Sequence, residues 1–186
     1  MNDVELTQFR ATRLTTIAFP PYRFLPGRDP HPTASPKGHS YLPPGTPEPA
    51  VEWESEAAWE KCEAYLYGWD LCNHAYWWEA HEAWEGLWHE VERGSLPHRF
   101  LQGLIQVAAC HLKLRLGRAD GVERLRESSR GYLSSVIEEV KDASYMGVRV
   151  REFAASVDAY YAKVFRPDEG ILGHDSAIFP YCVPGR

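Results

Sequence analysis

The chain has 186 residues, of which 44% are hydrophobic and 13% aromatic, enough apolar side chains for one folded domain with a buried core. Its net charge of −6 and the lack of a basic run argue against a nucleic-acid partner. We find no apolar stretch of membrane-spanning length, no signal-peptide pattern and no CxxC pair among the four cysteines, so we expect a cytoplasmic protein with reduced thiols and no membrane partner.

The amino-terminal part differs in composition from the rest. Residues 1–50 contain ten of the 14 prolines, and proline excludes long helices and central strands. A disordered tail is one interpretation of such a segment. Apolar residues nevertheless recur through it: Ile17, Phe19, Tyr22, Phe24, Leu25, Tyr41 and Leu42. We therefore predict an extended arm packed on the core, in which residues 28–40 are held least tightly.

Beyond the arm, apolar residues recur at the spacing of helices. The five predicted helices cover residues 52–71, 73–92, 97–116, 119–143 and 146–164. The third is apolar nearly all round, except for Gln102, Gln106 and Lys113, which is typical of a central helix. We predict an all-α fold, a compact bundle of about five helices over residues 51–166, with the arm before it and an irregular tail over residues 167–186.

One stretch of 13 residues, Trp77–His89, contains four tryptophans, three glutamates and two histidines. On a helix that advances roughly 100° per residue, one stripe consists of His74, Trp77, Trp78, His81, Glu85 and Trp88. The opposite side consists of Glu79, Ala83, Gly86 and Glu90. Because an aromatic stripe is normally the buried face, we expect His81 and Glu85 to be buried and Glu79 to face solvent.

Two runs of this chain resemble the signature of the domain of unknown function 309 family. They are WEAHEAWE within Tyr65–His89 and LQGLIQ within Phe100–Ala109, and the resemblance covers about residues 62–130. It implies a compact helical bundle and no assigned activity. The signature positions that it implies are Glu79, His81, Glu82, Trp84, Glu85, Gln102, Gly103 and Gln106.

A metal site is one function that the signature stretch allows. His81 and Glu85 lie one helical turn apart, as pairs of helix-borne metal ligands do. The pattern is not HExxH, because a glutamate occupies position 85. Further ligands would come from the arm or the tail, and the candidates are His31, His39, His174 and Asp175. A divalent metal as cofactor therefore stays an open alternative.

An acid–base enzyme is a second alternative, because a glutamate beside a histidine can carry protons. The catalytic candidates are His81, Glu82 and Glu85, with a glutamine of the third helix to orient a substrate. No serine or cysteine nucleophile lies in a recognisable motif. Such an enzyme would be hydrolase-like, with or without a metal.

The interpretation that we favour is a non-catalytic binding or interaction module with a buried polar network. Tryptophan N–H groups need acceptors, and glutamates supply them. The members of the network would be Trp78, Glu79, His81, Glu82, Glu85, Gln102 and Gln106. A buried His81 predicts that His81→Ala costs at least about 2 kcal/mol of stability. The many aromatic residues also leave self-association open.

Overall fold

The computed structural model describes residues 12–141, 143–173 and 184–185. The helices in this part of the chain are η1 (Glu56–Lys61, a 3-10 helix), α2 (Glu63–Asn73), α3 (Trp77–Glu90), α4 (Leu96–Arg115), α5 (Ala119–Val140) and α6 (Val150–Val164). Two short antiparallel strands follow, β1 (Phe165–Arg166) and β2 (Gly170–Ile171). The prediction of an all-α bundle of about five helices is confirmed.

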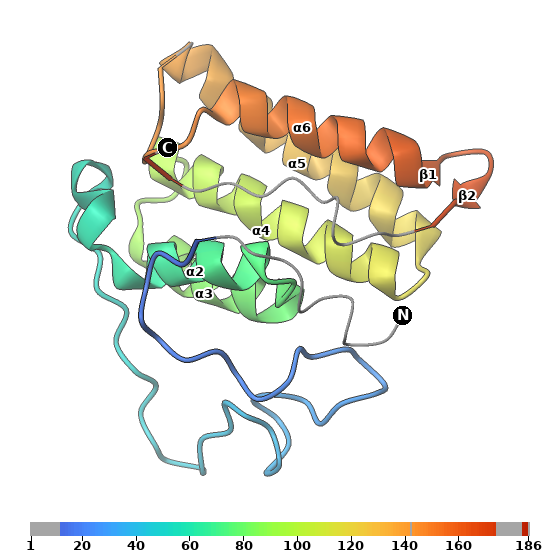
Figure 1. Cartoon of the computed structure of the whole chain (residues 1–186). Coiled ribbons are helices and arrows are strands. Elements are labelled where there is room, and N and C mark those ends of the chain that lie inside the picture. The colour runs from blue at the N-terminus through green and yellow to red at the C-terminus, as the bar shows by residue number, and fades with distance from the viewer. Residues whose placement is uncertain (1–11, 142, 174–183, 186) are drawn as a thin grey trace.

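The helices form layers around α4 (Figure 1). In the view of Figure 1, α6 and α5 lie above α4, and α2 and α3 lie below it. Buried residues run along the whole length of α4, from Phe100 through Leu104 to Leu114. The prediction that this helix is central is therefore confirmed, and its apolar surface explains why: it packs on both layers.

The predicted first helix is wrong in its first half. Residues 52–55 have no helix or strand, and the 3-10 helix η1 ends before Cys62, whose backbone is extended with φ −77° and ψ 93°. No residue of η1 is buried. Because its sequence is mostly polar, this segment has too little apolar surface to hold an α-helix against the core, and the long helix begins only at Glu63.

Aromatic rings join α2, α3 and α6 in the core. The ring of Trp69 lies 5.1 Å from that of Trp84 and 5.3 Å from that of Phe153, both edge-on, measured between centroids. Gly68 allows this approach, because a Cβ atom there would lie 2.2 Å from the indole nitrogen of Trp84. Trp69 and Trp84 are therefore structural, and the glycine is required by the packing of two helices.

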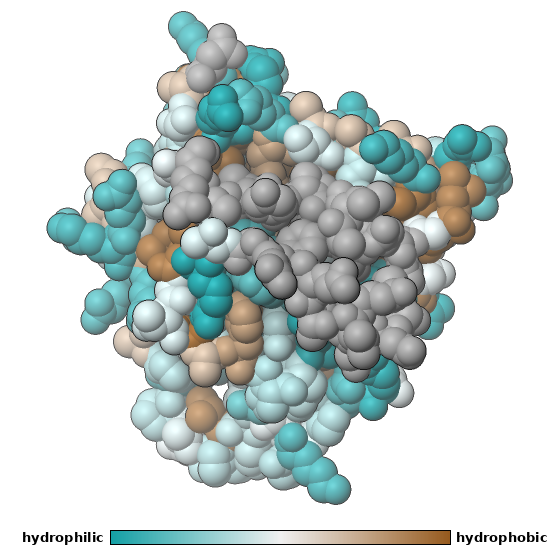
Figure 2. Space-filling view, viewed as in Figure 1, coloured by the Kyte–Doolittle hydropathy of each residue, from teal (hydrophilic) through white to brown (hydrophobic). Residues whose placement is uncertain are grey.

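Residues 12–54 have no helix or strand and run along the α2–α3 layer (Figure 1). The expectation that residues 28–40 are the loosest part is wrong. Backbone hydrogen bonds join Ser35 to His31 and Ser40 to Pro32, and the side chain of His39 is only 3% exposed. The longest continuously exposed run of the arm is residues 42–50, and the lower end of the molecule, where the arm lies, is mainly hydrophilic in Figure 2.

Candidate functional site

The three candidate catalytic residues lie together on α3. His81 Nδ1 lies 3.2 Å from Glu82 Oε1, and His81 Nε2 lies 3.9 Å from Glu85 Oε2. One ligand atom of each residue lies within 4.8 Å of the others. The helix produces this grouping, because Glu82 follows His81 directly and Glu85 is one turn further on.

The prediction that His81 and Glu85 are buried is wrong. Their side chains are 26% and 41% exposed, and that of Glu82 is 40% exposed. The apolar residues of α3 that are buried are Trp77, Ala80, Trp84 and Leu87. This stripe is rotated by one residue from the predicted one, because the neighbouring helices pack on the side that carries Ala80 and Trp84. His81, Glu82 and Glu85 therefore lie where water can reach them.

The prediction for Glu79 is wrong in the opposite direction. Glu79 was expected to face solvent, and its side chain is buried. Its Oε1 atom accepts hydrogen bonds from the backbone N–H of Phe24, at 2.9 Å, and from His39 Nε2, at 3.1 Å. Both of these donors belong to the arm. Burial raises the pKa of the Glu79 carboxyl, and the bonds from Phe24 and His39 oppose that rise.

The neighbouring Trp78 packs against the same part of the arm. Its ring meets those of Phe24, His31 and His39 edge-on, with centroids 5.4, 5.6 and 6.3 Å away. His31 and His39 were candidate metal ligands, and they lie at Trp78 rather than in the cluster of three donors on α3. The other two candidates, His174 and Asp175, lie outside the described residues.

Gln102 and Gln106 are half-buried on α4. In the part of the chain that the structure describes, no hydrogen bond joins either glutamine to His81, Glu82 or Glu85. Two tryptophans of the predicted stripe do contact α4: the Trp77 ring lies 3.8 Å from that of His111, and the Trp88 ring lies 4.6 Å from that of His98, measured between centroids. The predicted packing of the His81/Glu85 face on the two glutamines stays a prediction.

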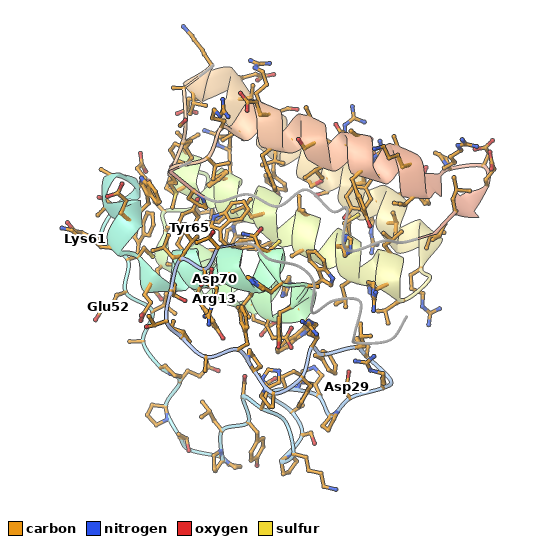
Figure 3. The ribbon with its side chains drawn as sticks, viewed as in Figure 1. Arg13, Asp29, Glu52, Lys61, Tyr65 and Asp70 are labelled. Atoms are coloured by element: carbon orange, nitrogen blue, oxygen red, sulfur yellow. The ribbon has the colours of Figure 1, made fainter. Side chains whose placement is uncertain are left out.

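Asp70 is a site residue that the sequence analysis missed. Its carboxylate is fully buried on α2 and accepts hydrogen bonds from Leu14 N at 2.7 Å, Thr15 N at 2.9 Å and Thr15 Oγ1 at 2.8 Å. Arg13 Nε lies 3.6 Å away, and Figure 3 shows the two side chains together where the arm reaches α2. The sequence did carry one sign of this site, because Asp70 is a charged residue inside the apolar run Gly68–Cys72.

A second missed group lies between α3, α4 and α6. His111 is fully buried, with its ring centroid 3.8 Å from that of Trp77 and 5.4 Å from that of Tyr160. The adjacent Cys110 is also buried, which raises the pKa of its thiol to about 11. The thiol is therefore protonated at neutral pH and is not an activated nucleophile.

Residues 65–125 match the family model described as Domain of unknown function (DUF309). This segment is similar to the DUF309 family. The match spans α2 from Tyr65, all of α3 and α4, and the start of α5. The DUF309 region therefore contains His81, Glu82 and Glu85 and the two buried carboxylates, while the arm and α6 lie outside it.

The other comparisons add no relative. No match to the chain was found among the curated proteins, and none among the solved structures. No helix in the described part of the chain is long and apolar enough to cross a lipid bilayer.

Proposed function

We propose that the protein is a non-catalytic binding module whose ligand is a divalent metal ion, held by His81, Glu82 and Glu85. The observation that supports this proposal is that one ligand atom of each residue lies within 4.8 Å of the others. An imidazole nitrogen and two carboxylate oxygens are suitable donors for ions such as Zn²⁺ and Mn²⁺. A cation would also offset the repulsion between the two glutamates.

The donors fit such an ion after a small movement. Ligands bind Zn²⁺ at about 2.0–2.2 Å, which places neighbouring donor atoms roughly 3–3.5 Å apart. The distance of 3.2 Å joins Glu82 to Nδ1 of His81, and the distance of 3.9 Å joins Glu85 to Nε2. Because one ion binds only one of the two ring nitrogens, one glutamate must turn toward the nitrogen that the other glutamate already faces. Both glutamates are about two-fifths exposed, so their side chains have room to turn. Three protein ligands leave further coordination positions for water or a ligand.

The test is elemental analysis and calorimetric titration with Zn²⁺ and Mn²⁺ of untagged protein purified without chelator. We expect one ion per chain in the wild type and loss of binding in His81→Ala. The matched control is His89→Ala, because His89 is an exposed histidine on the same helix. Equal binding by the two variants, or no binding by the wild type, would contradict the proposal.

An acid–base, hydrolase-like enzyme is the second candidate function for the same residues. The distance of 3.2 Å between His81 Nδ1 and Glu82 Oε1 favours it, because a carboxylate beside an imidazole orients the ring for proton transfer. Turnover of p-nitrophenyl acetate or p-nitrophenyl phosphate that disappears in His81→Ala and in Glu82→Gln would support catalysis. Turnover unchanged by both substitutions would contradict it.

The proposal also includes a cytoplasmic location and a chain in three parts: arm 1–50, bundle 51–166 and tail 167–186. Cys62, Cys72 and Cys110 are free and buried, which supports a reducing compartment. The hydrogen bonds from the arm to Asp70 and Glu79 support the packing of the arm on the bundle. The net charge of −6 still argues against a nucleic-acid partner.

A further inference from the structure

Two buried acidic side chains of the bundle depend on the arm. Asp70 on α2 is 0% exposed and Glu79 on α3 is 5% exposed. Asp70 accepts three hydrogen bonds from Leu14 and Thr15, and Glu79 accepts one from Phe24 and one from His39. A buried carboxylate without donors is costly. The bundle therefore needs an arm in this position.

The arm also contacts backbone carbonyl groups and several aromatic rings of the bundle, among them Tyr76 and Trp78. The hydroxyl groups of Tyr67 and Tyr76 donate to the carbonyl oxygens of Ala18, at 2.9 Å, and Pro20, at 3.2 Å. The Phe19 ring lies 4.9 Å from that of Tyr76, stacked on it, measured between centroids. None of these contacts requires the arm and the bundle to belong to the same chain.

The connection between the arm and the bundle carries few contacts. Residues 42–50 are all exposed and include four prolines, and one turn, Thr46 N–H to Pro43 carbonyl, is described within them. Proline-rich segments are stiff and extend by about 3.1 Å per residue, so nine residues reach roughly 28 Å. That is about the width of a small domain, so the arm can reach a neighbouring molecule.

We propose that the α2–α3 face binds the arm of a second copy of this chain, so that two copies exchange residues 13–41 and form a dimer. Every contact to Asp70, Glu79 and Phe19 is kept in the exchanged form, and only the exposed connection changes its path. Exchange of an identical segment is for this reason a low-cost route to dimers. The proposal is independent of the metal site, because the contacts of the described arm residues 12–50 are made to other residues than His81, Glu82 and Glu85.

The test follows exchange between full-length copies. One sample carries a donor dye on the arm, through Lys37→Cys, and the other an acceptor dye on the bundle, through Glu90→Cys. Both positions are exposed, Cys62, Cys72 and Cys110 are buried, and Cys182 is replaced by serine in both samples. We expect energy transfer between copies that grows with protein concentration, together with a species of twice the 21.2 kDa chain mass by light scattering.

Phe19→Ala separates arm exchange from other forms of association. Loss of this ring removes the same contact from the closed monomer and from the exchanged dimer, so the ratio of the two should stay unchanged. Release of the arm, and with it the exchange between copies, should become at least about tenfold faster, while Leu42→Ala, in the exposed connection, should leave that rate unchanged. A species of 21.2 kDa without transfer between copies, or exchange between copies that Phe19→Ala does not accelerate, would overturn the proposal.

Shortening the connection between the arm and the bundle gives a second test, which leaves all contacts of the arm with the bundle in place. Deleting residues 44–48 from the full chain hinders the return of the arm to its own bundle, so the dimer fraction should rise with the helix content unchanged. A shortened chain that remains a monomer with full helix content would also overturn the proposal.

Discussion

His39 Nε2 of the arm lies 3.1 Å from Glu79 Oε1 of α3, and the two side chains are only 3% and 4% exposed. The contact joins residues 40 positions apart in the chain. It closes the arm over Trp78 and places a carboxyl group in an environment that disfavours its charge. Several properties of the protein should depend on it.

The first prediction concerns pH. Burial raises the pKa of Glu79 above its ordinary value of 4.5 in the folded state, so the folded protein binds more protons than the unfolded chain between the two values. Stability should therefore fall as pH rises through that window, by at most about 1.4 kcal/mol per pH unit from one group. Urea unfolding of the wild type and Glu79→Gln at several pH values measures this contribution.

The substitution Glu79→Gln should remove this part of the pH dependence, because the amide does not titrate. Glu90→Gln is the control, since Glu90 is exposed on the same helix. The same slope of unfolding free energy against pH in wild type and Glu79→Gln would show that the buried carboxyl does not contribute.

Asp70→Ala should lower stability by about 3–5 kcal/mol, because the donors of Leu14 and Thr15 lose a fully buried charged partner. Asp158→Ala is the control. Asp158 lies 3.3 Å from Arg130 at the surface and is 35% exposed, so we expect at most about 1 kcal/mol there. Chemical denaturation gives both values, and equal losses would contradict the role of Asp70 as the anchor of the arm.

His81→Ala should change the unfolding free energy by no more than about 1 kcal/mol, because a half-exposed ion pair contributes little. If His81 were buried, the same substitution should lower the unfolding free energy by at least about 2 kcal/mol. The melting temperature of metal-free protein decides between these values. A large loss would mean that the histidine belongs to a structural network after all.

Two glycine-to-alanine substitutions should change the stability of the protein in opposite directions. In Gly68→Ala the new methyl group would meet the Trp84 ring, at 2.2 Å from its nitrogen, and we expect a loss of about 1–3 kcal/mol. Gly131 in α5 has open space around it, so Gly131→Ala should stabilise the helix by roughly 0.5–1 kcal/mol. Thermal unfolding of the two variants measures both changes in stability. Changes in the same direction would contradict the packing of Gly68 on Trp84.

The bundle itself was predictable from residue spacing. Ser95 and Pro97 mark the start of α4, where the Ser95 side chain accepts the backbone N–H of His98, and Gly117 follows its end in a left-handed conformation. These are local signals, and helices with long apolar stripes follow them. The DUF309 resemblance was predictable for the same reason, because its signature is a continuous pattern in the chain.

The face on which each signature residue lies was not predictable. On a wheel, the stripes through Ala80 and through His81 differ by one residue, and both contain tryptophans. Which stripe is buried depends on where α2 and α4 pack. Glu79 was assigned to solvent because nothing near it in sequence identifies Phe24 and His39, 55 and 40 residues away, as its hydrogen-bond partners.

The sequence by itself thus determined the helices from α3 to α6, their order and the central position of α4, because helix formation depends on neighbouring residues. Only the tertiary structure decided that Asp70 and Glu79 are buried beneath the arm and that His81, Glu82 and Glu85 are open to water. Burial depends on contacts between segments far apart in the chain, and no local pattern of residues records them.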